Sequence, residues 1–360
     1  MSDVPAGTSP LLAVPGAVPL ADAAVPPDAA VPWHYGDPLR EQRMLAAGRA
    51  VTDLSHRGVV RVTGPDRLTW LHSLTTQHLT GLAPGVPAEA LVLTPHGHVE
   101  HALHLVDDGA STWITVEPGT VTELVGWLDR MRFLLRVEVT DVTSAWAVVG
   151  LAAGPGDPLP GGLLPPADLT SPAPPSWQDP WPAVSPGSVS YSGIPDGDHP
   201  GHARPWREVL IPRDELTDRL AGVLLAGSWA SEALRVEAWR PRLGAETDHR
   251  TIPHEVDWLR TAVHLAKGCY RGQETVARVH NLGRPPRRLV MLHLDGSEDT
   301  LPGARDAVLL GDRPVGFVTT AARHHELGPV ALAMVRRSVP VGAPLLVSGL
   351  AAAQEIVVRP

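Results

Sequence analysis

Apolar and polar residues recur with two different periods along the chain. Apolar positions three to four residues apart predict helices at 41–56, 65–79, 120–135, 213–227, 228–239 and from Gln273 onward. Alternation, or a short apolar run, predicts strands at 58–64, 90–94, 98–106, 111–116, 136–142, 145–151 and 208–212. Because helices and strands are interleaved, we expect an α+β fold built on a split β-α-β pattern.

The pattern changes in three parts of the chain. Residues 287–360 hold almost only short strands joined by Gly turns, which predicts a small C-terminal β-barrel or sandwich. Residues 1–40 are rich in Pro and Ala without periodicity, so a flexible extension is expected there. Residues 154–205 are crowded with Pro and Gly and are interpreted as a linker or surface excursion. Two α+β units are expected between these parts, at 41–153 and 206–286.

Composition excludes several classes of protein. Hydrophobic residues make up 43% of the 360, enough for proper cores, and the net charge of −9 argues against a DNA-binding protein. One cysteine excludes an intramolecular disulfide framework and a zinc site made of cysteines alone. No apolar run approaches the roughly 20 residues of a membrane helix, and the N-terminal residues do not resemble a secretory signal. We therefore expect a cytoplasmic protein that binds neither DNA nor membrane.

Three rare residues lie close together. The only Lys, Cys and Asn of the chain are Lys267, Cys269 and Asn281, and Gly268 and Gly272 bracket the cysteine. Lys267 is two residues from Cys269, so both side chains would share a face in extended geometry. A nearby ammonium stabilises thiolate over thiol, which would make the cysteine reactive. The alternative is that Cys269 is a small, buried and inert apolar residue in a turn.

This segment also resembles a known family. Lys267-Gly268-Cys269-Tyr270-Arg271-Gly272-Gln273-Glu274, followed by Arg278, is similar to the K-G-C-[YF]-x-G-Q-E-x3-R signature of the YgfZ-type folate-binding proteins. These are relatives of the glycine cleavage T-protein, an aminomethyltransferase. Segments 53–82, 235–255 and 313–337 also resemble that superfamily. The resemblance implies a three-domain cloverleaf, with two ferredoxin-like domains and a C-terminal β-barrel.

The resemblance also implies a folate site at the centre of the cloverleaf. Glu237 matches the family's pterin-binding glutamate, and a carboxylate can accept two parallel N–H bonds from a pterin edge. Trp229, two turns earlier on the same predicted helix, could be an aromatic wall. The alternatives are a solvated helix glutamate and a core tryptophan. Arg57 stands roughly where better-known relatives carry a tryptophan against the folate.

One hairpin departs from the family pattern. The T-protein carries a catalytic aspartate there, whereas this chain has Thr94-Pro95-His96-Gly97-His98. Without a carboxylate, aminomethyl transfer lacks its obvious acid–base group. The same hairpin carries a series of histidines, but no Cys or Asp supplements them, and no metal site is predicted; the histidines are His96, His98, His101 and His104.

The expected function follows from the resemblance. It implies an accessory protein that binds tetrahydrofolate or a one-carbon derivative and serves the assembly or repair of iron–sulfur proteins. Cys269 would be the reactive thiol and Lys267 its activator, with folate and iron–sulfur client or assembly proteins as partners. The alternatives are a folate-dependent aminomethyltransferase like the T-protein and a non-catalytic folate-sensing scaffold. A tetrahydrofolate-dependent one-carbon transferase activity stays open among these.

Overall fold

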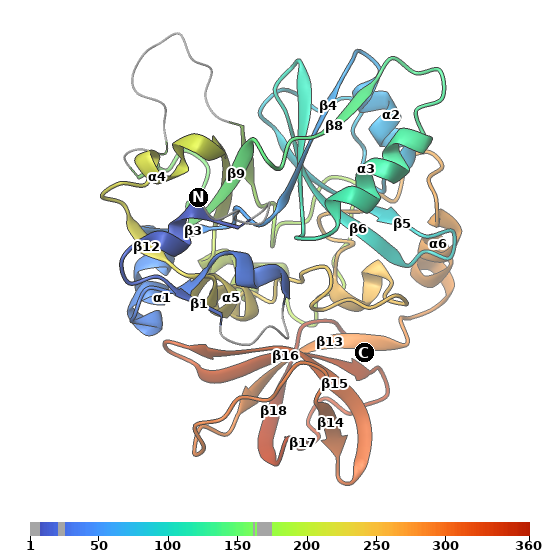
Figure 1. Cartoon of the computed structure of the whole chain (residues 1–360). Coiled ribbons are helices and arrows are strands. Elements are labelled where there is room, and N and C mark those ends of the chain that lie inside the picture. The colour runs from blue at the N-terminus through green and yellow to red at the C-terminus, as the bar shows by residue number, and fades with distance from the viewer. Residues whose placement is uncertain (1–7, 21–25, 161–162, 164–174) are drawn as a thin grey trace.

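The computed structural model describes residues 8–20, 26–160, 163 and 175–360. They form three lobes, each built on a β-sheet, that meet at the centre of the molecule (Figure 1). Two lobes combine a sheet with helices, and the third is a closed barrel. The predicted α+β fold with a C-terminal β-barrel is confirmed.

The first lobe is a five-stranded sheet assembled from distant parts of the chain. Its strand order is β10 (Ser176–Gln178), β11 (Trp206–Pro212), β9 (Trp146–Ala152), β3 (Ala50–Asp53) and β12 (Leu224–Ala226). All neighbours are antiparallel except β12, which pairs with β3 in parallel. Since β3 and β9 belong to the first predicted unit and the other strands to later segments, the two α+β units are entwined. The helices of this lobe are α1 (Pro38–Ala46), α4 (Leu216–Arg219) and α5 (Ser228–Glu237).

The second lobe comes from one continuous stretch of chain. Its antiparallel sheet has the order β5 (Pro87–Leu93), β6 (Val99–Asp107), β7 (Ser111–Val116), β4 (Gly58–Thr63) and β8 (Glu138–Asp141). Helices α2 (Arg67–Leu74) and α3 (Val121–Arg130) cover it and share its apolar core. Helix α6 (Gln273–Leu282) carries the second half of the K-G-C motif.

The third lobe is a closed barrel whose strands carry apolar residues on both faces. Its closed order is β13 (Arg287–Leu294), β16 (Gly328–Arg336), β15 (Arg313–His324), β14 (Ala307–Leu310), β17 (Leu345–Val347) and β18 (Leu350–Ile356). On β13, Val290 and Leu292 fill the barrel, whereas Leu289 and Met291 point into the core between the lobes. Successive side chains of a strand face opposite ways, so a strand buried on both faces needs apolar residues throughout.

Two predicted helices are partly strand. Within 41–56 the helix ends at Ala46, and Ala50–Asp53 is strand β3. Gly48 makes the turn with a φ of +67°, a left-handed conformation that glycine adopts at little cost. Within 213–227 only a short helical segment forms. Gly222, with a φ of +77°, then turns the chain into β12.

The two Pro-rich segments are also more ordered than expected. Residues 8–20 and 26–40 are packed against the body, with Leu11 and Val31 fully buried, so the flexible-extension prediction is wrong for them. Residues 175–205 add β10 to the first sheet and bury Trp177, Trp181 and Tyr191, so this part is no linker. Burial of these large aromatic side chains stabilises a stretch that forms little regular secondary structure. The rest of both predictions, at 1–7, 21–25, 161–162 and 164–174, lies outside the described residues.

No helix in the described ranges combines the length and the hydropathy needed to cross a membrane.

Candidate functional site: a charged chamber between the lobes

The place where the lobes meet is lined by charged, polar and apolar side chains and is almost filled. We call this the central chamber; its cavity has about 10 Å³, and it is lined by Arg57, Ala102, His104, Thr115, Val116, Glu117, Pro241, Arg242, Leu243 and Trp258. This volume is about that of one water molecule. The lining residues come from β6, β7, the turn before β4 and the segment after α5.

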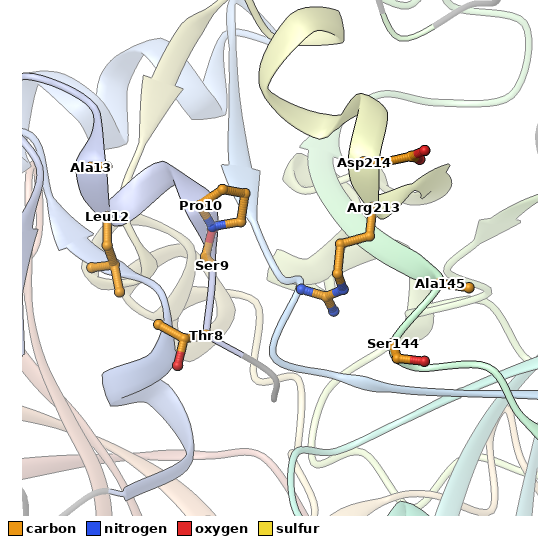
Figure 2. Close-up of a pocket in the computed structure, with 9 residues that line it drawn as sticks. All are labelled: Thr8, Ser9, Pro10, Leu12, Ala13, Ser144, Ala145, Arg213 and Asp214. Carbon is orange, nitrogen blue, oxygen red and sulfur yellow. The ribbon is translucent and has the colours of Figure 1, made fainter. Parts of the chain in front are cut away.

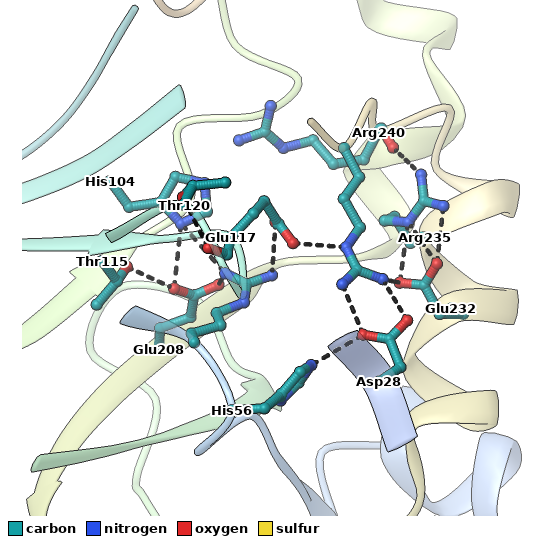
Figure 3. Close-up of polar contacts among 12 residues, drawn as sticks. Asp28, His56, His104, Thr115, Glu117, Thr120, Glu208, Glu232, Arg235 and Arg240 are labelled. Atoms are coloured by element: carbon teal, nitrogen blue, oxygen red, sulfur yellow. Dashed lines mark hydrogen bonds and ion pairs between the residues drawn. The ribbon is translucent and has the colours of Figure 1, made fainter. Parts of the chain in front are cut away.

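A fully buried carboxylate lies beside this cavity. Glu208, on β11, accepts hydrogen bonds from Arg57 Nη1 (2.5 Å) and Thr115 Oγ1 (3.2 Å), and its Oε2 lies 3.1 Å from His104 Nδ1. Burial acts to raise the pKa of Glu208, but the charges of Arg57 and His104 hold it well below its usual range. Glu208 is therefore an ionised acceptor at neutral pH. Figure 3 shows it beside His104 and Thr115.

A chain of alternating charges runs from Glu208 across the chamber. Arg57 Nη2 lies 3.5 Å from Glu117, and Arg242 Nε donates to the other Glu117 oxygen at 2.6 Å. Arg242 then holds both oxygens of Asp28, at 2.7 and 2.8 Å. Burial acts to lower the pKa of Arg242, but Glu117 and Glu232 raise it well above its usual value. The paired charges satisfy one another in a place where an isolated charge would be costly.

Flat rings also border the chamber. The His104 ring stacks on Trp177 with centroids 3.7 Å apart and planes within 5° of parallel. The fully buried Trp258 lines the cavity from another segment. Together with Glu208 they offer a carboxylate acceptor beside aromatic surfaces, which is what a flat heterocycle with N–H donors requires.

Arg57 is the only one of the three predicted folate-contacting residues that lines the chamber. Glu237, at the end of α5, instead lies with Oε2 3.2 Å from His324 Nε2 on the barrel strand β15. Trp229 stacks on Trp33 with ring centroids 5.7 Å apart. The contacts of Glu237 therefore differ from those of Arg57, and the carboxylates that meet Arg57 are Glu208 and Glu117.

Lys267 and Cys269 lie in different surroundings. Lys267 is buried, and its Nζ donates to the backbone carbonyls of His72, Thr75 and Gln77. These bonds use all three N–H donors of the ammonium. Burial lowers the pKa of Lys267 to about 8. Cys269 is exposed, so the alternative that it is buried is wrong. Lys267 therefore acts as a tether to segment 72–77, with the three N–H donors of its ammonium all directed at backbone carbonyls.

The rest of the motif packs against the unusual hairpin. A Cβ on Gly272 would lie 2.6 Å from the Thr94 carbonyl oxygen, and one on Gly97 would lie 2.7 Å from Thr275 Cβ. Arg271 adds an ion pair with Glu100 at 2.8 Å. The hairpin and the motif therefore form one surface. Of the remaining motif residues, Tyr270 is buried, Gln273 is half-buried, and Gly268, Glu274 and Arg278 are exposed.

Metal-ligating residues do not converge in the part of the chain that the structure describes. No three His, Cys, Asp or Glu side chains there are arranged to hold a metal ion. Of the histidine series, His104 belongs to the chamber, His101 is buried, and His96 and His98 lie at the hairpin with ring centroids 6.3 Å apart.

A much larger cavity, of about 910 Å³, lies between the N-terminal segment and the first sheet (Figure 2). Its charged lining residues are Arg213 and Asp214. The Arg213 guanidinium donates to the backbone carbonyls of Ser55, Thr143 and Trp146, so it serves the fold. This cavity lacks a convergent set of reactive groups, and the chamber is the better candidate site.

Comparisons with known proteins agree with this architecture. Residues 29–156 match the GCVT N-terminal domain, and residues 287–359 match the glycine cleavage T-protein C-terminal barrel domain. The crystal structure of glycine cleavage system aminomethyltransferase T from Bartonella henselae superposes with a TM-score of 0.72 and 19% identity, covering 97% of this chain and 95% of that one. The chain belongs to the glycine cleavage T-protein superfamily.

Three curated relatives are 26–30% identical to this chain. A protein of Arabidopsis thaliana named as a chloroplastic transferase is 30% identical over 76% of this chain, which spans 62% of that protein. The aminomethyltransferase of Moorella thermoacetica is 26% identical, covering 85% of this chain and 83% of that protein. That of Streptomyces coelicolor is also 26% identical, with 85% and 83% covered.

Sequence reasoning missed most of the chamber. Glu208 was only the first residue of a predicted strand, although a single carboxylate in the apolar run of β11 is a signal of a buried charge. Glu117 follows the apolar β7 in the same way. Asp28 and Arg242 lie in segments without periodicity, so no sequence signal places them in the chamber.

Proposed function

We propose that the protein binds a reduced folate, as tetrahydrofolate or a one-carbon derivative, in the central chamber. The observation that carries this proposal is the ionised, fully buried Glu208 beside the His104–Trp177 stack. Glu208 would accept the N–H bonds of the pterin edge, and Arg57 would orient that carboxylate. When bound, the folate would carry or accept a one-carbon unit.

Titration with folinic acid, a stable folate, followed by tryptophan fluorescence tests this site. Glu208→Gln keeps the shape but loses the charge that two N–H donors recognise, so we expect its affinity to fall at least tenfold, about 1.4 kcal/mol. Glu237→Gln is the matched control, because Glu237 contacts the barrel, and should bind as the wild type does. Loss of affinity in Glu237→Gln alone would restore the sequence-based assignment.

Within this superfamily, we propose an accessory role toward iron–sulfur proteins with Cys269 as the working thiol. The similarity of the K-G-C motif to YgfZ-type proteins and the exposure of Cys269 support this role. In cells that depend on the protein, Cys269→Ala should abolish the activity of iron–sulfur enzymes while folinic acid binding stays intact. Full activity with Cys269→Ala would favour a folate-sensing scaffold instead.

Aminomethyl transfer is the second candidate, and the superfamily itself favours it. Against it, the hairpin offers the hydroxyl of Thr94, which accepts bonds from the backbone N–H groups of His96 and His98, where an acid–base carboxylate is needed. An assay with aminomethylated lipoyl protein and tetrahydrofolate should therefore release no ammonia. Measurable release would establish the transferase.

A further inference from the structure

A segment of the chain from outside the chamber contacts one of its lining residues, Arg242. Residues 26–34, which we call the strap, comprise a 3-10 helix, Pro26–Ala30, and strand β2 (Pro32–His34). Asp28 is 5% exposed and reaches the chamber, where Arg242 holds both its oxygens and His56 Nε2 lies 2.9 Å from Oδ1 (Figure 3).

This contact has the geometry of ligand recognition. A guanidinium that meets both oxygens of a carboxylate is the arrangement by which arginine holds a free carboxylate ligand. Arg242 is separated from Asp28 by 214 positions in the sequence and is positioned independently by Glu117, which accepts from its Nε at 2.6 Å. Arg242 and His56 therefore form a carboxylate subsite whose occupant belongs to a separate segment.

A second contact of the strap has the same character. Trp33 stacks on Trp229, at an interplanar angle of 19°. The strap backbone lies directly on the start of α5, since a Cβ on Gly227 would be 2.2 Å from the Trp33 carbonyl oxygen. The strap thus covers Trp229, the aromatic side chain that the resemblance assigns to folate, as well as the subsite at Arg242.

We infer that the strap is a built-in occupant of the chamber, with Asp28 filling a carboxylate subsite that an anionic ligand takes over when the arm 26–30 moves away. The part concerning folate rests on the proposed function; the subsite itself does not. A cavity of about 10 Å³ cannot admit a pterin, whereas sites for such ligands usually measure about 300 Å³ or more. A ligand of that size therefore requires a rearrangement around the chamber, and we place it at the arm, whose Asp28 holds the lining residue Arg242.

The arm has fixed points on both sides. Leu11 and Val31 are fully buried, and Ser9 N donates to the carbonyl of Ala30 at 2.8 Å. When Asp28 leaves the subsite, these contacts keep it close to Arg242. The arm therefore competes with a ligand at a high effective concentration. The apparent affinity for a ligand is lowered by the fraction of molecules in which the strap is closed.

Chemical rescue tests the subsite without folate. Asp28→Ala removes the carboxylate and leaves space beside Arg242, so sodium formate should raise the Tm of this variant by several degrees more than that of the wild type, with sodium chloride at equal concentration as the salt control. Asp28→Asn fills the space with an amide and should not respond. Asp129→Ala, at an exposed aspartate, is the control for charge alone. Equal formate responses in Asp28→Ala and wild type would overturn the subsite.

Folinic acid tests the strap in the full-length wild type as well as in the variant. We expect Asp28→Ala to bind it about tenfold more tightly, the effect of losing one strong competing contact. Hydrogen exchange of the strap amides should rise when the wild type binds folinic acid. If folinic acid binds, but the strap stays protected and Asp28→Ala gains nothing, the strap proposal is wrong and the folate site stands. If neither protein binds it, the proposed function fails, and the formate response alone decides the subsite.

Discussion

At the scale of single residues, two glycines set the distance between the hairpin and the K-G-C motif. Gly272 and Gly97 both have positive φ, at +82° and +79°, and each lies against the other's segment. Any side chain there must push the two segments apart. The surface that carries Cys269 therefore depends on the absence of two Cβ atoms.

Gly272→Ala should destabilise the protein by about 2–3 kcal/mol, because the Cβ meets backbone atoms and the conformation is strained. Gly268→Ala is the matched control in the same motif, since no atom lies within 4 Å of its Cβ position, and should be nearly neutral. Urea unfolding of both variants measures the difference. Equal losses would show that the hairpin contact does not hold the motif.

A second pair of substitutions distinguishes the role of Lys267 from that of Cys269. Lys267→Met leaves the carbonyls of His72, Thr75 and Gln77 without their donor, so we expect a loss of about 3 kcal/mol in the free energy of unfolding. Cys269→Ala should change stability by less than about 0.5 kcal/mol, since its side chain is exposed. A neutral Lys267→Met would remove its role as a tether.

At the scale of elements, buried ion pairs join the sheets. Arg240, just after α5, donates to Glu89 on β5 at 2.8 Å and to Asp179 at 3.0 Å, and all three are buried. These bonds connect the second sheet with the segment that follows β10. The contact therefore aligns two lobes around the chamber.

Arg240→Met should cost about 3–5 kcal/mol, since it leaves two buried carboxylates without their partner. Arg136→Met, which breaks an exposed pair with Asp66, is the control and should leave the Tm unchanged because such pairs contribute little. A small effect of Arg240→Met would mean that water replaces the guanidinium between the sheets.

The elements also show what the sequence could and could not predict. Strands such as 111–116 matched their predicted bounds because alternation and β-branched residues agree there. The predicted helix 41–56 runs past Gly48, where the observed helix has already ended, and the predicted helix 213–227 runs past Gly222 in the same way. Motif recognition found the K-G-C surface, but Glu208 meets Arg57 only through tertiary packing between β11 and the turn before β4.

At the scale of the whole molecule, buried histidines make stability depend on pH. Burial lowers the pKa of His254 to about 4, with a smaller contribution from nearby His280, and burial lowers that of His199 to about 3. In the unfolded chain both would titrate near about 6.5. As the pH falls below that value, the unfolded state takes up protons that the folded state does not, so stability is lost between about pH 6.5 and 4.

His254→Leu removes one of these groups. Its loss of unfolding free energy between pH 7.5 and pH 5 should be about 2 kcal/mol smaller than that of the wild type, one pKa unit being about 1.4 kcal/mol. Urea unfolding at a series of pH values measures this. Parallel curves for the two proteins would show that His254 accepts a proton without unfolding.

The order of strands in the first sheet has a consequence for biosynthesis. β3 begins at Ala50, but its parallel partner β12 ends only at Ala226. The sheet therefore cannot be completed until residues 50–226 have left the ribosome. Until then the nascent chain presents unpaired strand edges, which are prone to aggregate. We expect slow folding and a need for chaperones during synthesis, because alternating stretches of one polypeptide form the two lobes.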